Sequence, residues 1–386
     1  MKHDISSSVR YIGADDKTLD LFEGKYIIPE GISYNSYLIL DERPAIMDTV
    51  DIRRSGEWMD NLLAELGGRT PWCVVLSHME PDHAASLQLL LERFPDIRIV
   101  GNAKTFAMIP QFFDIAPDRN AEVVGEGSTL STGSHTLRFF MAPMVHWPEV
   151  MTAYEESEKI LFSADAFGKF GALDTEAEWD CEARRYYFNI VGKYGAQVQS
   201  LLKKLSGCEI RTIAPLHGPV LRENIGYYTD KYDTWSIYRP EDDGVFIACA
   251  SIYGNTARVA HALAGILEAR GAAKVSFADL ARCDMAEAIE DAFRYDKLVV
   301  ASATYDGGIF TPMENFITQL SGKNYRQRRV AIIENGSWAP MAGRKMREMF
   351  EAMKDITICE TTATIRSAFK PGDITSLEAI ADELLA

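Results

Sequence analysis

The chain has 386 residues, of which 47% are hydrophobic and 25% are charged, so it is long enough for two domains that each bury a core. Its formal net charge is −16 at pH 7, which argues against nucleic acid or an anionic membrane as a partner, because both are bound by clustered lysine and arginine. No apolar run approaches the roughly 18 residues that a membrane-spanning helix needs.

The cysteines predict neither a thiolate metal site nor a disulfide framework. No two of them form a C-x-x-C pair, which excludes a zinc ribbon or a rubredoxin-type iron site. They are Cys73, Cys181, Cys208, Cys249, Cys283 and Cys359. We expect free thiols and, because the N-terminus carries no apolar signal segment, a cytoplasmic location.

The first part of the chain predicts strands with helices between them. Residues 25–40 suggest a hairpin that turns near Gly31, and a helix should begin at Pro81. Further strand-like pieces lie at 44–50, 72–78, 129–143 and 150–165. A long helical pattern covers 179–205, and one more strand should precede His217. This order predicts a sandwich of sheets covered by helices.

A polar stretch rich in proline and glycine at 238–245 predicts a domain boundary, which divides the chain into domains 1–240 and 241–386. Strand and helix then alternate with little left over. Strands are expected at 245–251, 274–278, 297–302, 329–334 and 356–362. Helices are expected at 256–270, 285–293, 313–320, 341–354 and 374–385. Five such βα units predict an α/β domain with a doubly wound parallel sheet.

Seven side chains of the kind that bind metals follow strand ends in the first part. "LSHMEPDH" carries four of them after an apolar strand, and three more follow later strands. They are His78, Glu80, Asp82, His83, His146, Asp165 and His217. Any one of these residues alone is more often simply hydrogen-bonded. Together they are too many for one tetrahedral zinc and suit two metal ions with one bridging carboxylate. The remaining histidines, His3, His135 and His261, are expected to be structural.

Three loops at strand ends in the second part predict a mononucleotide site. The first, "SIYGNT", opens a helix and fits neither a P-loop nor a G-x-G-x-x-G fingerprint, so it suits a phosphate held by backbone N–H groups. The loops at 302–310 and 335–340 add Tyr305 and Trp338, which could flank a flat ring. The candidate residues are Ser251, Ile252, Tyr253, Gly254, Asn255, Thr256, Ala303, Thr304, Tyr305, Asp306, Gly307, Gly308, Asn335, Gly336, Ser337 and Trp338.

"HMEPDH" resembles the H-x-H-x-D-H signature of the metallo-β-lactamase-like fold, with Glu80 in place of the middle histidine. With the later residues in order, the whole chain resembles the flavodiiron proteins, or A-type flavoproteins. The resemblance implies an N-terminal metallo-β-lactamase-like αββα sandwich and a C-terminal flavodoxin-like domain that binds FMN.

The resemblance also implies a ligand set for two non-haem iron ions. His78, Glu80 and His146 would bind one iron, and Asp165 would bridge the pair. The other iron would be bound by Asp82, His83 and His217. The interval from Asp165 to His217 looks shorter than in some members of the family, which leaves an open position on the second iron as an alternative to ligation by His217.

The function implied is reduction of O2 to water or of NO to N2O, with FMN relaying electrons from a separate donor. Rubredoxin, an NADH-linked reductase or reduced deazaflavin are candidate donors. The family also implies a head-to-tail homodimer or a dimer of dimers. No feature of the sequence points to NO, so our expectation leans to O2. The alternatives are a dinuclear zinc hydrolase with an accessory flavodoxin-like domain, and a non-enzymatic FMN electron carrier.

Overall fold

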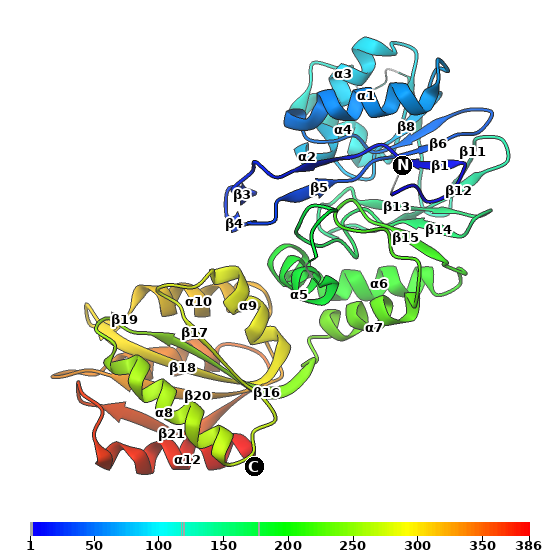
Figure 1. The fold of residues 1–386 in the computed structure, drawn as a ribbon. Helices are drawn as coiled ribbons and strands as arrows, with labels where there is room; N and C mark the ends of the chain where they lie inside the picture. The colour runs from blue at the N-terminus through cyan, green and yellow to red at the C-terminus, as the bar shows by residue number, and fades with distance from the viewer. Residues whose placement is uncertain (1–2, 117, 119, 177) are drawn as a thin grey trace. The chain divides into compact units, whose positions relative to one another are not determined.

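The computed structural model describes residues 3–116, 118, 120–176 and 178–386. The chain divides into two compact units (Figure 1). The first comprises residues 1–187 and 194–233, and the second comprises residues 188–193 and 234–386. Within the described part of the chain, no helix is both long enough and apolar enough to cross a membrane.

The first unit contains two sheets packed face to face. One has the strand order β1 (Val9–Tyr11), β6 (Tyr37–Ile39), β7 (Ala45–Met47), β8 (Cys73–Val75), β9 (Arg98–Gly101), β10 (Ala121–Val123). The other runs β11 (Thr129–Ser131), β12 (Thr136–Met141), β13 (Met151–Glu155), β14 (Ile160–Phe162), β15 (Thr212–Ala214). Alternate side chains from both sheets, such as Met47, Val75, Phe139 and Phe162, form one buried core.

Helices cover the outer faces of this sandwich (Figure 1). The first sheet is flanked by α1 (Ser55–Leu66), α3 (Leu87–Arg93) and α4 (Ala103–Phe112). The second is flanked by α5 (Trp179–Tyr186), α6 (Gly195–Leu205) and α7 (Ile225–Ser236). The predicted αββα sandwich is confirmed, and the four strands expected within 129–165 are present as β11 to β14.

The predicted hairpin at 25–40 is wrong. Its residues form β4 (Tyr26–Ile27), which pairs with β3 (Leu21–Phe22), and β5 (Ile32–Tyr34), which pairs with β2 (Ala14–Asp16). Gly31 has φ of +69°, and a Cβ there would meet the Asp16 carbonyl oxygen at 2.4 Å. The turn is therefore packed against the upstream backbone, which takes β5 as its partner.

The predicted continuous helix at 179–205 is also wrong. A π-helical segment (Tyr187–Val191) and a 3-10 turn (Gly192–Tyr194) separate α5 from α6. Within the second unit, Phe188 stacks on Phe293 with ring centroids 4.2 Å apart, and Asn189 Nδ2 donates to the Ala286 carbonyl. Glycine at 192 lowers helix propensity, and these contacts favour a break in the helix over its continuation.

The second unit has five parallel strands in the order β17 (Val275–Asp279), β16 (Asp242–Ala250), β18 (Tyr295–Tyr305), β20 (Arg328–Asn335), β21 (Ile356–Ile365). A short strand, β19 (Gly308–Ile309), pairs with β18. The helices are α8 (Asn255–Ala269), α9 (Met285–Arg294), α10 (Thr311–Gly322), α11 (Ala342–Glu351) and α12 (Ile374–Leu385). In sequence order the strands read 2-1-3-4-5, the flavodoxin-like arrangement, so the doubly wound sheet is confirmed.

Candidate metal centre and flavin pocket

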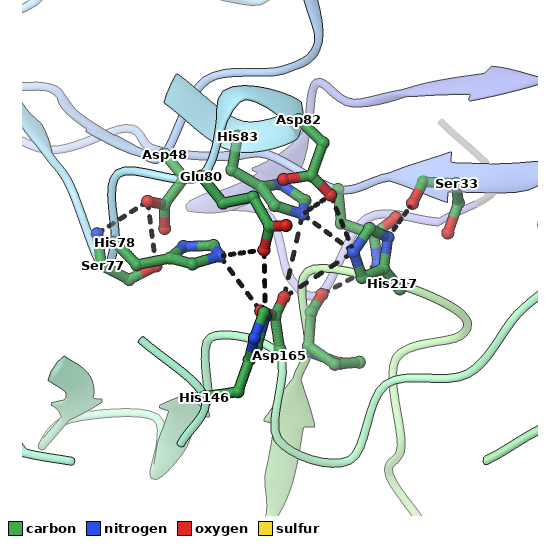
Figure 2. Close-up of polar contacts among 12 residues, drawn as sticks. Ser33, Asp48, Ser77, His78, Glu80, Asp82, His83, His146, Asp165 and His217 are labelled. Atoms are coloured by element: carbon green, nitrogen blue, oxygen red, sulfur yellow. Dashed lines mark hydrogen bonds and ion pairs between the residues drawn. The ribbon is translucent and has the colours of Figure 1, made fainter. Parts of the chain in front are cut away.

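The segment after β8 places four of the seven predicted metal ligands. His78 and Glu80 lie in the loop, and Asp82 and His83 lie on α2 (Pro81–Ala84). Glu80 is the extended N-cap and Pro81 occupies the first helical turn, a position where proline needs no N–H partner. The loop and the one-turn helix therefore turn these side chains toward the same space (Figure 2).

Three other loops bring the remaining candidates. His146 lies between β12 and β13, Asp165 follows β14, and His217 follows β15. His78, Asp165 and His217 are at most 1% exposed. All seven predicted residues point toward one another, although they come from four separate segments of the chain (Figure 2).

The first cluster consists of His78, Glu80, His146 and Asp165, with one ligand atom from each within 4.8 Å of the others. Asp165 Oδ2 lies 3.0 Å from His78 Nε2 and 3.0 Å from His146 Nε2. Glu80 Oε2 lies 2.9 Å from His146 Nε2 and 3.6 Å from His78 Nε2.

The second cluster consists of Asp82, His83 and His217. Asp82 Oδ2 lies 3.2 Å from the Nε2 atoms of both histidines, and those two nitrogens are 3.0 Å apart. Asp165 Oδ1 lies 3.8 Å from His83 Nε2 and 3.7 Å from His217 Nε2. Asp165 thus directs one oxygen toward each cluster.

Several of these buried atoms have no hydrogen-bond partner among the described residues. They include Nε2 of His78 and of His146 and both carboxylate oxygens of Asp82 and Asp165. Leaving a buried polar atom unpaired is costly, so such atoms usually have a partner. Convergent imidazole nitrogens and carboxylate oxygens are the ligand atoms that a pair of iron ions accepts, so the residues present fit a dinuclear metal site.

The carboxylates and histidines of the site shift one another's pKa. Burial by itself disfavours the charged form of His146, but the adjacent carboxylates of Asp165 and Glu80 raise its pKa to about 10. Burial likewise opposes ionisation of Asp165, yet the neighbouring His78 and His146 hold its pKa well below the usual range. The site therefore favours anionic carboxylates, which are the form that binds metal ions.

His217, the ligand that the sequence left most open, is placed firmly in the second cluster. Its Nδ1 lies 2.7 Å from the Ser33 carbonyl oxygen, which can only accept, so Nδ1 carries the proton. In the neutral ring Nε2 then has a free lone pair that faces Asp82 and His83. A backbone carbonyl that fixes the tautomer in this way is typical of metal-binding histidines.

Aromatic rings surround the two clusters. The rings of Phe22 and Tyr186 lie 5.5 Å from that of His217, and Tyr34 lies 6.2 Å from His83. Trp147 lies 6.5 Å from the rings of both His78 and His146. The metal centre therefore has an apolar surround, which limits the access of water.

Sequence reasoning missed three carboxylates near the centre. Asp48 accepts hydrogen bonds from the backbone N–H and the hydroxyl of Ser77, and burial raises its pKa to about 6. Glu149 accepts a hydrogen bond from the Met79 N–H. Burial and the adjacent Glu80 raise the pKa of Glu23 to about 7. Asp48 follows an apolar strand as the predicted ligands do, whereas nothing in the sequence distinguishes the other two.

In the second unit, a pocket of about 360 Å³ lies at the carboxyl ends of the strands. The predicted residues Gly254, Tyr305 and Gly308 are not part of its lining, whereas the other thirteen are. The lining also includes Ala339, Met341 and Ser367, which the sequence did not predict. Ser367 follows β21 and its backbone N–H donates to Asn335 Oδ1, so the fifth strand adds a fourth loop to the pocket.

The geometry of this pocket suits a mononucleotide such as FMN. Gly254 caps α8 with φ of +84°, and its N–H donates to Ser251 Oγ. The N–H groups at the start of α8 have no intrahelical partner and can hold a phosphate. Tyr253 and Trp338 are each 90% exposed, so aromatic surface is available at the mouth to cover a flat ring. The lining contains no lysine or arginine.

The fold and the two sites define a class of protein, in which a metallo-β-lactamase-like unit with a dinuclear-type centre accompanies a flavodoxin-like unit. Residues 32–218 match a family model described as ODP family beta lactamase. The chain is 28% identical over 386 residues to the anaerobic nitric oxide reductase flavorubredoxin of Klebsiella pneumoniae, covering 97% of this chain and 79% of the relative. The relative from Shigella flexneri is 28% identical over 379 residues, covering 95% of this chain and 78% of the relative.

Solved structures share the fold. Rubredoxin oxygen:oxidoreductase from Desulfovibrio gigas superposes with a TM-score of 0.91 at 24% identity, covering 99% of this chain and 97% of that one. The flavodiiron protein from Giardia intestinalis gives a TM-score of 0.90 at 24% identity, covering 99% and 96%. Over nearly its whole length the chain therefore shares the fold of these flavodiiron proteins, and residues 32–218 match the beta-lactamase family model.

Proposed function

We propose that this chain is an oxidoreductase that reduces O2 to water, NO to N2O, or both, at a non-haem diiron site, with FMN relaying electrons from an external donor. The observation that carries this proposal is the pair of clusters that share Asp165. The curated relatives are named nitric oxide reductases and a similar solved structure is named an oxygen oxidoreductase, which supports both substrates as candidates.

In this proposal, seven side chains would hold the two irons. His78, Glu80 and His146 would hold one, and Asp165, whose Oδ2 lies 3.0 Å from His78 Nε2 and from His146 Nε2, would be shared between the two. Asp82, His83 and His217 would hold the other; Asp165 Oδ1 lies 3.8 Å from His83 Nε2 and 3.7 Å from His217 Nε2. Glu80 gives the first cluster a hard oxygen ligand where a zinc site of this fold would have a third histidine, which favours redox iron over zinc.

When bound, the iron pair and FMN would together supply up to four electrons, the number that reduction of O2 to two waters consumes. The chain's own residues bind and orient. Phe22, Tyr186 and Trp147 limit water around the clusters. This leaves an apolar approach that suits a small uncharged molecule such as O2 or NO.

When FMN is bound in the pocket of the second unit, it would accept electrons from a donor outside the chain. We propose that the N–H groups at the start of α8 and the hydroxyls of Ser251 and Thr256 hold the phosphate of FMN. The exposed ring of Trp338 lies at the pocket where a donor or another subunit can approach. Rubredoxin, an NADH-linked reductase and reduced deazaflavin remain the candidate donors.

We further propose that a head-to-tail homodimer, or a dimer of such dimers, brings the FMN of one subunit to the diiron centre of its partner. Turnover should then fall on dilution below the dimer dissociation constant, and sedimentation velocity at the same concentrations should show dissociation. A fully active monomer would rule this assembly out. We also propose a cytoplasmic location, which the six free cysteines support.

The first test is the metal and flavin content of protein purified without oxygen. About two irons and one FMN per chain are expected, with consumption of O2 or NO by the reduced protein. Comparing the two rates at equal substrate concentration decides between the substrates. Two zincs with no flavin would instead support the hydrolase, an alternative that the names of the relatives do not favour. FMN with a metal site that Fe(II) cannot restore would support the electron carrier.

A further inference from the structure

Glu149 links two of the loops that carry the first cluster. Its carboxylate Oε1 accepts a hydrogen bond of 2.8 Å from the backbone N–H of Met79. Met79 stands between His78 and Glu80, and Glu149 itself lies three residues after His146. The Glu149 side chain thus ties the loop that carries His78 and Glu80 to the loop that carries His146.

The loop that bears Glu149 is anchored at further points. The backbone N–H of Met151 donates to the Ser77 carbonyl at 2.9 Å, which ties the same two loops together. Asn102 donates from Nδ2 to the Glu149 carbonyl, while its Oδ1 caps α4 by accepting from Lys104 N at 2.9 Å. Through Asn102 and Glu149, the N-terminus of α4 supports the geometry of the first cluster.

The burial of Glu149 argues for a role beyond general stability. The residue is 1% exposed, and Oε2 has no hydrogen-bond partner among the residues that the structure describes. A buried carboxylate with a single hydrogen bond costs free energy relative to an apolar side chain of the same shape. A buried unpaired polar atom of this kind calls for a specific explanation, and the adjacent metal-binding cluster supplies one.

We propose that Glu149 is a positioning residue that holds His78, Glu80 and His146 in the geometry that binds the first metal ion, without itself touching the metal. The second cluster has no contact with this carboxylate among the described interactions, so the effect should be confined to the first metal. The inference rests on the proposed dinuclear function and adds a residue that supports one half of it.

The test is Co(II) titration of metal-free protein, followed by the visible d–d absorption of the bound ion. Wild-type protein should take up two Co(II) per chain. Glu149→Leu removes the acceptor, and Glu149→Asp keeps the charge but withdraws the oxygen by one methylene. Both variants should bind one of the two Co(II) ions about 10- to 100-fold more weakly, the usual effect of losing an outer partner of a metal site. Glu149→Gln keeps an acceptor for Met79 N–H and should restore both ions.

Glu155 offers a matched control. It is also fully buried, and its carboxylate accepts backbone N–H bonds from Ser157 at 2.8 Å and Glu158 at 2.6 Å. Glu155→Asp should lower the unfolding temperature while leaving two Co(II) per chain.

To identify the affected ion, Glu149→Asp is combined with His217→Ala, which weakens metal binding by the second cluster. The double variant should bind no Co(II) tightly, whereas each single variant keeps one ion.

The possible outcomes separate this inference from the proposed function. Wild-type protein that binds no Co(II) would overturn both. Two unchanged ions in Glu149→Asp would overturn only the positioning role. Equal loss of Co(II) affinity in Glu149→Gln and Glu149→Leu would show that the negative charge matters rather than the hydrogen bond. That result would also overturn the positioning role. If Glu149→Leu does not fold, the Asp and Gln pair still decides between these results.

Discussion

Asp165 Oδ2 lies 3.0 Å from His78 Nε2, while the second oxygen of the same carboxylate faces the other pair of histidines at 3.7 to 3.8 Å. Neither oxygen has a hydrogen-bond partner among the described residues. A single carboxylate that faces two sets of imidazoles in this way is suited to bridging two cations. The relationship makes Asp165 the residue on which both halves of the proposed centre depend.

Replacing Asp165 with alanine should therefore impair both metals at once. We expect the affinity for each metal to fall by more than the roughly 100-fold that removal of an outer partner causes, because Asp165 would be a direct ligand of both metals. Iron content after anaerobic reconstitution measures the effect. Asp41→Asn serves as the control, since Asp41 bonds Thr132 and His135 in a turn remote from the clusters. Retention of two irons in Asp165→Ala would contradict the bridging role.

Exchanging Glu80 for histidine tests why this chain departs from the H-x-H-x-D-H pattern. Glu80 Oε2 lies 2.9 Å from His146 Nε2, so the substitution replaces an oxygen ligand with a nitrogen one at the first cluster. We expect the ratio of zinc to iron bound from an equimolar mixture to rise, because imidazole suits zinc better than a carboxylate does. Elemental analysis gives the ratio. A variant with two irons and full turnover would show that this account of Glu80 is wrong.

Thr256 lines the pocket of the second unit and is 2% exposed, at the start of α8. Thr256→Val removes a hydroxyl while keeping the shape, so FMN should bind about 5- to 30-fold more weakly, the equivalent of one or two lost hydrogen bonds. Flavin fluorescence quenching measures the dissociation constant. Thr311→Val provides the comparison, since Thr311 opens α10 but is exposed and not part of the pocket lining. Equal affinity in the two variants would place the phosphate elsewhere.

The buried pair His135 and Glu155 should make the stability of the first unit depend on pH. The hydrogen bond to Glu155 raises the pKa of His135, so the stability due to protonated His135 is fully present below about pH 6.5 and is lost as pH rises through the raised value. Burial opposes ionisation of Glu155, but His135 and nearby N–H groups lower its pKa. Its contribution is therefore present above about pH 4.3 and lost as pH falls through the lowered value.

Because both conditions hold between about pH 5 and pH 6.5, His135→Gln should be most destabilising there, by about 2 kcal/mol. The difference from wild type should shrink by pH 9, as measured by urea unfolding at both pH values. His261→Gln is the control, because His261 is exposed on α8 and stacks on Phe277. A destabilisation independent of pH would mean that the His135–Glu155 bond does not require the charge on His135.

Much of the second unit could be predicted from the sequence because its signals are local. Each strand is a short apolar run and each helix has its own periodicity, so the expected strand at 297–302 is found within β18 and the expected helix at 285–293 within α9. Predictions failed where distant contacts decide. Residues 25–40 pair with an upstream strand, and Phe188 interrupts a helical pattern by stacking on Phe293.

By itself, the sequence determined which residue types stand at strand ends: imidazoles and carboxylates in the first part, and hydroxyls, amides and glycines in the second. These patterns are encoded by neighbouring residues, so they can be read without coordinates. Only the tertiary structure decided which side chains meet, because convergence depends on how separate loops pack. It placed His217 beside Asp82, turned the two oxygens of Asp165 toward different histidines, and set the Glu149 carboxylate against the backbone N–H of Met79. A buried atom acquires its partner, or lacks one, only when the chain is folded.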